Sequence, residues 1–136
     1  AEAFGSLFAA PPTIEVFERR GDWLSWGELP DPSAGAELWF AVVRGTLAET
    51  DSAAAQEMHD AIAAGGQAAA QEAGDIAHVV FTGLADPGEF LAIDVWESDA
   101  AIEATYGDPA FGAAFASLFS EAPTIQVFRS TDWYQW

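Results

Sequence analysis

The chain has 136 residues, which suits one domain of ordinary size, and its 22 acidic against four basic residues give it a formal net charge of -18. A charge of this sign and size repels nucleic acid and anionic lipid surfaces, so both are excluded as primary partners. No cysteine is present, which excludes disulfides and thiolate metal sites.

The hydropathy pattern is that of a protein outside the membrane. No apolar run approaches the roughly 20 residues that span a bilayer, and no basic start followed by an apolar stretch marks a secretory signal. We therefore expect a cytoplasmic protein. The acidic surface has two interpretations: it keeps an ordinary protein soluble, or it is an adaptation to high salt, where counterions screen the self-repulsion.

Three segments precede the main body of the chain. Residues 1–9 are predicted to be the end of an amphipathic helix, because three large apolar residues stand at helical spacing. Thr13–Glu18, with its β-branched and aromatic residues, is predicted to be a strand. Residues 27–36 are rich in proline and glycine and are predicted to be a linker.

The main body begins with a strand and a long helix. The stretch ELWFAVVRGTLA, residues 37–48, is predicted to be the strand, and residues 50–74 are predicted to be the helix. Thr50 or Asp51 fits the N-cap of this helix, and Gly74 fits its end.

A hairpin, two short helices and a last strand follow. Residues 75–83 and 90–97 are predicted to be strands joined by the turn LADPGE. Ser98 is expected to cap one short helix and Asp108 another, with a proline in the first helical position of the second. Residues 123–130 are predicted to be the last strand.

The element order β-α-β-β-α-β is the split βαβ pattern of a ferredoxin-like α+β fold. Helices in this arrangement cover one face of the sheet, so the other face needs a cover. The strand at 90–97 is apolar on both faces, with Leu91 and Ile93 on one and Phe90 and Trp96 on the other. A second sheet is therefore expected to pack against the first, supplied either by another subunit or by a preceding repeat.

The end of the chain repeats its beginning. Phe4–Arg20 aligns with Phe115–Thr131 at an offset of 111, and Asp22–Trp26 aligns with Asp132–Trp136 at an offset of 110. The two copies share a proline, two tryptophans and the spacing between them, which indicates a duplication.

This repeat gives the expected domain organisation. Residues 1–26 are interpreted as the last helix and strand of a first repeat, 27–36 as a linker and 37–136 as one complete ferredoxin-like repeat. Because the first repeat lacks its front, we expect the chain to be a fragment of a longer tandem protein.

The stretch LAIDVWESDAAIEATYGDPAFGAAF, residues 91–115, resembles the signature of the antibiotic-biosynthesis-monooxygenase-like group of dimeric α/β-barrel proteins. In that group an acidic residue, a tryptophan, Glu-Ser and an amphipathic helix follow in the same order. The resemblance implies a dimeric or pseudo-dimeric barrel built from two ferredoxin-like sheets, with each last strand reaching onto the neighbouring sheet. Its members include cofactor-free monooxygenases of aromatic polyketides or quinols, and haem-degrading enzymes.

Two departures from the family patterns bear on cofactors. Many cofactor-free members carry an asparagine four residues before the tryptophan, and here that position is Ala92. Haem-degrading members use a histidine on the following helix, where this chain has Ala104, Thr105 and Tyr106. The resemblance therefore implies no haem, and we expect no cofactor.

His78 and Asp94 are the leading candidates for catalysis. If the hairpin pairs so that opposite positions sum to 172, the two side chains face each other, and a slip of one residue separates them. The pair would then be either a usable proton acceptor or a buried polar pair that only satisfies its own hydrogen bonds. His59, beside Glu57 and Asp60, is expected to be solvated or at an interface.

Three further residues are candidates for binding substrate. Trp96, which the family motif carries, is expected to line a pocket, and Tyr106 is expected to close it. Arg44 on the first strand either anchors an anionic substrate oxygen or forms a salt bridge. No metal site is predicted, because two distant histidines and scattered carboxylates lack the spacing of metal ligands.

Two functions remain open. The chain is either a small-molecule enzyme, for example a cofactor-independent oxygenase of an apolar aromatic or quinol-type substrate, or a non-catalytic domain. The non-catalytic alternative is a barrel domain for small-molecule binding or assembly. The expected partners are a small apolar or aromatic molecule and a second copy or repeat, joined through the sheet and the last strand.

Overall fold

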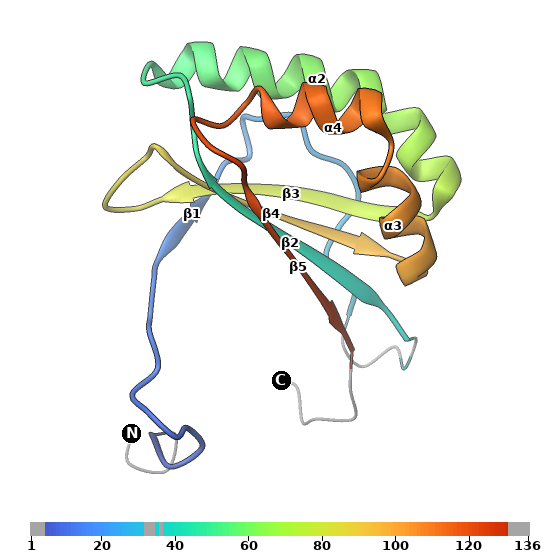
Figure 1. Ribbon diagram of the computed structural model, residues 1–136. Helices are drawn as coiled ribbons and strands as arrows, with labels where there is room; N and C mark the ends of the chain where they lie inside the picture. Colours follow the sequence, from blue (N-terminus) through green and yellow to red (C-terminus); the bar gives the residue numbers. More distant parts are fainter. Residues whose placement is uncertain (1–4, 32–34, 36, 131–136) are drawn as a thin grey trace.

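The computed structural model describes residues 5–31, 35 and 37–130, which form one antiparallel sheet with helices on one of its faces (Figure 1). The strand order in this five-stranded sheet is β1-β3-β4-β2-β5. The elements are β1 (Phe17–Arg19), β2 (Trp39–Thr46), α2 (Ser52–Ala73), β3 (Asp75–Gly83), β4 (Glu89–Trp96), α3 (Asp99–Tyr106), α4 (Pro109–Ala116) and β5 (Thr124–Arg129).

The predicted ferredoxin-like α+β fold is confirmed. From β2 to β5 the chain runs strand, helix, strand, strand, helices and strand, and the predicted bounds of these elements are right to within about two residues. Helices α2, α3 and α4 all lie on one side of the sheet in Figure 1. The β1 strand adds a fifth member, because it pairs with the outer edge of β3.

The helix ends follow from local hydrogen bonds. The Asp51 side chain accepts from the backbone N–H of Ala54, which makes Asp51 the N-cap of α2. Gly74 ends this helix at a φ of 119°, a left-handed conformation that glycine adopts without a steric cost. Ser98 and Asp108 cap α3 and α4 in the same way as predicted.

The segment before β1 differs from its prediction. The strand expected at Thr13–Glu18 is shorter and later, at Phe17–Arg19, because Ile14 and Val16 are 79% and 61% exposed and lie outside the paired ladder. Of the helix predicted over 1–9, residues 1–4 lie outside the described part of the chain, and Gly5 and Phe8 close a turn.

The two copies of the repeated ending can be compared only in part. In the first copy, Trp23 is buried in the core and Trp26 pairs through its backbone with His78 of β3. The second ending, Asp132–Trp136, lies outside the described residues. The division into a remnant and a complete repeat stays a prediction.

The core lies between the sheet and the helices. Alternate residues of the central strands β2 and β4 turn toward the helices, and there they meet the first-copy tryptophan and the end of α4. Buried members of this cluster are Trp23, Val43, Leu47, Ala55, Val80, Phe90, Ala92, Leu118 and Phe119.

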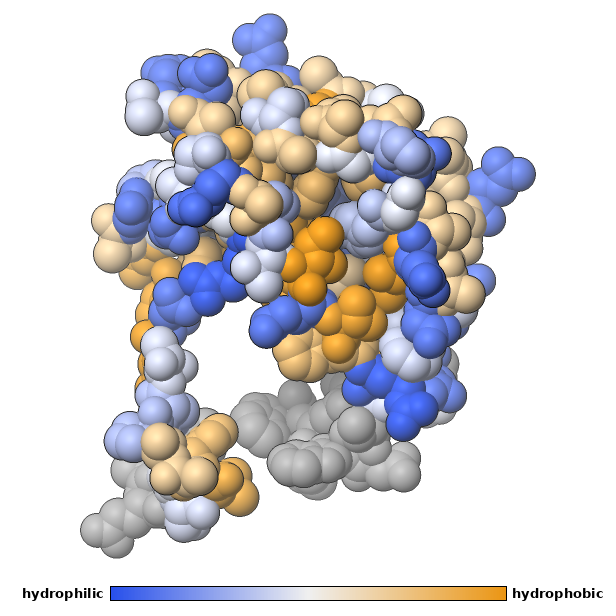
Figure 2. All heavy atoms as spheres, viewed as in Figure 1, coloured by the Kyte–Doolittle hydropathy of each residue, from blue (hydrophilic) through white to orange (hydrophobic). Residues whose placement is uncertain are grey.

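The opposite face of the sheet carries exposed apolar side chains. On β5, which forms one edge, Phe128 pairs with Phe40 on this face and is 52% exposed. Ile125 and Val127 pair with Val43 and Ala41 and so lie on the helix side of the same edge, where they are 39% and 47% exposed. Figure 2 shows apolar residues gathered below the helices, over the strands. The expected second sheet on this face stays a prediction. Among the described residues, no helix has the length and hydropathy to cross a membrane.

A β-bulge interrupts the pairing of β3 with β4. Asp75 pairs with Trp96 and Ala77 pairs with Val95, so Ile76 is an extra residue on β3. Gly27 passes directly beside this bulge at a φ of 66°, and a Cβ on Gly27 would lie 2.1 Å from the carbonyl oxygen of Ile76. The bulge and the segment after Trp26 therefore fit together only with glycine at this position.

We predict that Gly27→Ala destabilises the protein by about 1 to 3 kcal/mol, because the alanine is strained at positive φ and collides with backbone. Gly65→Ala is the matched control: Gly65 lies inside α2 with open space around it, so alanine should stabilise by about 0.5 to 1 kcal/mol. Urea unfolding of both variants measures the two free energies. A Gly27→Ala variant as stable as the parent would contradict this packing.

Candidate active site

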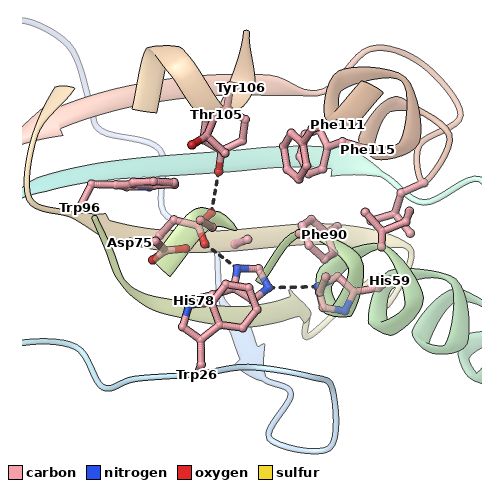
Figure 3. Close-up of a pocket in the computed structure, with 17 residues that line it drawn as sticks. Trp26, His59, Asp75, His78, Phe90, Trp96, Thr105, Tyr106, Phe111 and Phe115 are labelled. Atoms are coloured by element: carbon pink, nitrogen blue, oxygen red, sulfur yellow. Dashed lines mark hydrogen bonds and ion pairs between the residues drawn. The ribbon is translucent and has the colours of Figure 1, made fainter. Parts of the chain in front are cut away.

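A cavity of about 60 Å³ lies between the helices and the sheet, with room for several water molecules (Figure 3). Figure 3 shows Asp75 and Trp96 at one end of it and Phe111 and Phe115 at the other. Its walls come from α2, α3, α4, β3, β4 and the segment before β2, and most are apolar, among them Ile62, Ala63, Phe90, Phe111, Phe115 and Leu118.

A chain of hydrogen bonds crosses the wall of this cavity. The Tyr106 hydroxyl donates to Asp94 Oδ2 over 2.7 Å, and Asp94 Oδ1 lies 2.5 Å from His78 Nδ1. The Nε2 atoms of His78 and His59 lie 3.1 Å apart, and His59 Nδ1 lies 2.9 Å from Asp60 Oδ1. The two rings and the Asp94 side chain are buried, while the Asp60 side chain is 33% exposed. The chain therefore links the cavity to the surface.

The geometry fixes the number of protons on the two histidines. The Asp94 and Asp60 carboxylates only accept hydrogen bonds, so the Nδ1 atom that faces each of them is the donor. Each ring then directs Nε2 at the other ring, and two unprotonated nitrogens cannot form a hydrogen bond. A hydrogen bond between the rings needs a proton on one Nε2, and with both Nδ1 atoms protonated the pair would hold one positive charge.

The environment places this charge on His78. Burial lowers the pKa of His59, and its hydrogen bond with Asp60 offsets only part of this effect. Burial also lowers the pKa of His78, but the charge and hydrogen bond of Asp94, with Asp75 and Asp60 beyond, outweigh it and raise that pKa above its ordinary value. His78 is thus the better of the two rings to carry the charge and donate to a neutral His59.

Tyr106 completes the chain as a permanent donor. Burial, together with the charge of Asp94, raises the pKa of Tyr106 well above its ordinary value. Its ring also packs edge-on against Trp96, Phe111 and Phe115, with centroids 5.7 to 6.3 Å apart. Tyr106 therefore joins the polar chain to the apolar end of the cavity.

The structure brings together four of the five residues chosen from the sequence. The register of β3 and β4 pairs His78 with Asp94, as the sum of 172 required, and Trp96 and Tyr106 also line the cavity. Arg44 is elsewhere: it forms an ion pair with Glu15 at 2.6 Å, which is the salt-bridge alternative. It does not line this cavity.

His59 corrects a prediction. It was expected to be solvated or at an interface, but only 4% of it is exposed. Its acidic neighbour Asp60 suggested a solvated helix face, yet the ring turns inward between Trp23 and His78, with centroids 5.1 and 5.3 Å away. The sequence did contain a signal for the buried position: His59 lies on a helix that must cover the sheet on which the other histidine, His78, lies.

Asp75 is a site residue that the sequence analysis missed. Strict alternation along β3 places Asp75 and His78 on opposite faces of the sheet, and the extra residue at the bulge puts both on the cavity side. Asp75 is 7% exposed. Burial, with the negative charge of Asp94, raises its pKa to about 7, although the charge of His78, the backbone at Ala77 and the Trp26 indole offset part of the rise.

Within the part of the chain that the structure describes, no three histidine or acidic side chains are grouped closely enough to hold a metal ion. Near neutral pH the site therefore offers two histidines that share one extra proton, the Asp94 carboxylate and the Tyr106 hydroxyl. It also offers the Asp75 carboxyl, which titrates in this range. Such groups can accept, pass on and return protons beside an apolar molecule.

A family model described as antibiotic biosynthesis monooxygenase matches residues 41–117 of the chain. The chain belongs to this family. The matched residues include α2, β3, β4, α3 and α4, which supply most of the cavity wall. No curated protein sequence matches the chain.

Solved structures show the same fold at low sequence identity. The protein Rv0793 from Mycobacterium tuberculosis is 18% identical with a TM-score of 0.54, and the match covers 72% of this chain and 99% of Rv0793. SnoaB, a cofactor-independent oxygenase from Streptomyces nogalater, is 17% identical with a TM-score of 0.50, covering 74% and 97%.

A longer protein is also similar. A protein from Lactobacillus acidophilus is 13% identical with a TM-score of 0.53, and the match covers 69% of this chain. The family member described here spans 45% of that protein's length.

The raised pKa of Asp75 predicts a pH-dependent stability difference. Because the folded-state pKa of about 7 lies above the ordinary value near 4, the neutral carboxyl stabilises the fold at low pH, and this contribution is lost as the pH rises through 7. Asp75→Asn should therefore gain stability relative to the parent between pH 4 and 7, by at most about 1.4 kcal/mol per pH unit.

The control for this measurement is Glu72→Gln, which removes an exposed carboxylate three residues away. Urea unfolding at several pH values gives the free energies. A stability difference between Asp75→Asn and the parent that is the same at pH 4 and pH 8 would show that Asp75 does not titrate in this range.

Proposed function

We propose that this member of the family is an oxygenase of small apolar aromatic molecules of the phenol or quinol type, and that it works without a cofactor. The observation that carries the proposal is the buried hydrogen-bond chain from Tyr106 through Asp94 and His78 to His59, placed along an apolar cavity. The fold shared with the cofactor-independent oxygenase SnoaB agrees with it.

In the proposed reaction the substrate itself reduces oxygen. Loss of a proton from a ring CH₂ or hydroxyl gives an enolate or phenolate, which donates electrons to O₂. For a CH₂ group, a C–O bond forms, the peroxide takes back a proton, and loss of water leaves a carbonyl. The sum is R₂CH₂ + O₂ → R₂C=O + H₂O. For a single-ring quinol, O₂ adds at a ring CH beside the phenolate, and loss of water leaves a hydroxyquinone: C₆H₆O₂ + O₂ → C₆H₄O₃ + H₂O.

The His78–Asp94 pair is the proposed entry point for the substrate proton. Because both nitrogens of His78 already carry protons, the Asp94 carboxylate is the member of the pair that accepts the proton, and His78 holds this carboxylate in place. The positive charge shared by the histidines would stabilise the anion. Arg44 cannot take this role, because it forms an ion pair with Glu15. An apolar site strengthens this attraction, because it excludes water.

Trp96 and Tyr106 are the proposed walls for the substrate ring. Both line the cavity, and Trp96 is only 1% exposed. The asparagine of many cofactor-free members is Ala92 here, which also lines the cavity, so the nearby polar groups would have to hold the substrate oxygen.

A second function, a non-catalytic barrel domain that binds a small molecule or builds an assembly, is favoured by one observation. The edge strand β5 exposes Phe128 on its outer face and Ile125 and Val127 on the other, which suits self-association through the sheet and the last strand as a homodimer or tandem pseudo-dimer. The charge of -18 leaves nucleic acid and anionic membranes as unfavourable partners.

Oxygen uptake against a panel of quinols and anthrones tests the enzyme. We expect uptake with at least one quinol, reduced about a hundredfold or more in His78→Ala, because Asp94 then loses the partner that holds it and the anion loses the nearby positive charge. Arg44→Ala is the control and should keep the parent rate, since Arg44 lies outside the cavity. No uptake with any compound, or equal rates in the parent and His78→Ala, would rule out this mechanism and favour the binding domain.

A further inference from the structure

Three buried polar atoms at one end of the cavity have no hydrogen-bond partner. They are Asp75 Oδ1, Trp26 Nε1 and Trp96 Nε1, and all three residues line the cavity. The Trp26 indole lies near enough to the Asp75 carboxyl to lower its pKa, but not in the geometry of a full hydrogen bond. A buried polar group without a partner costs about 1 to 3 kcal/mol, and such groups are rare in folded proteins. Three around one cavity call for a polar partner there, which water supplies in the free protein and a polar group of a ligand can replace.

The position of Asp75 depends on two features that come from distant parts of the chain. The bulge at Ile76 turns Asp75 toward the cavity beside Trp96, its partner across the strands. Trp26 exchanges two backbone hydrogen bonds with His78, at 3.1 and 2.9 Å, which hold the indole on the same side of the cavity (Figure 3). These constraints place an acceptor, the Asp75 carboxyl, and a donor, the Trp26 indole, at the same end of the cavity.

The chemistry of these atoms selects among ligands. Asp75 and Asp94 both line the cavity, and the histidine pair supplies one positive charge, so a ligand carboxylate or phosphate would meet net negative charge. A hydroxyl both donates and accepts, and so can satisfy the Asp75 oxygen and an indole N–H at once. The opposite end, formed by Phe111 and Phe115, suits an aromatic ring.

We propose that Asp75, with the Trp26 indole, is the recognition site for the hydroxyl group of a neutral phenol, whose ring lies toward Phe111 and Phe115. This inference rests on the proposed function for its substrate class, but it concerns binding and does not require turnover. It makes Asp75 a determinant of specificity: the carboxyl would reject a ring that lacks the hydroxyl, because its oxygen would then stay unpaired.

Phenol and toluene are the probes, since a methyl group replaces the hydroxyl at nearly the same size. Calorimetric titration gives the ratio of the toluene to the phenol dissociation constant for the parent, Asp75→Ala and Asp75→Asn. We expect this ratio to fall about tenfold in Asp75→Ala, which has no acceptor. It should fall by less in Asp75→Asn, which keeps an amide oxygen. Glu72→Gln, the exposed carboxylate control, should leave it unchanged.

Several results would overturn the inference. An unchanged ratio in Asp75→Ala would do so, and so would a parent protein that binds neither probe. If Asp75→Ala does not fold, an Asp75→Asn ratio equal to that of the parent has the same meaning. Asp75-dependent phenol binding without oxygen uptake would remove only the oxygenase proposal, and oxygen uptake with Asp75-independent binding would remove only this one.

Discussion

Two imidazole rings, a carboxylate and a phenol hydroxyl lie buried together beneath the helices, and each is tolerated there because the next one supplies its hydrogen bond. A buried charge without a partner is strongly destabilising, whereas a charge within a satisfied chain is not. The register of β3 and β4 sets His78 opposite Asp94, α2 brings His59 above them, and α3 brings Tyr106. The packing of α2 and α3 against the sheet therefore depends on the proton that the histidines share.

The segment that resembles the end of the chain takes part in this site. Trp23 lies against the ring of His59 and Trp26 against that of His78, with centroids 5.1 and 4.6 Å apart. The same segment meets the bulge at Ile76 through Gly27. The described residues from 37 onward therefore do not close the cavity alone, because Trp26 is also part of its wall.

The sequence predicted the order of the elements, most of their bounds and the His78–Asp94 pairing, because strand alternation, caps and hairpin register are local properties. It could not predict features that depend on contacts between distant segments. The inward turn of His59 is set by packing against Trp23 and His78, although its neighbour Asp60 suggested solvent. Asp75 joins the site only through one extra residue in β3, which a regular alternation pattern does not reveal.

The most direct test of this account is the protonation of the two histidines, measured by ¹⁵N NMR of the imidazole nitrogens at pH 7. The account predicts one imidazolium in the pair: both nitrogens of His78 carry protons, whereas His59 carries one on Nδ1 and none on Nε2. Two neutral rings at pH 7, or two fully protonated ones, would contradict the shared proton and with it the proposed role of the buried chain.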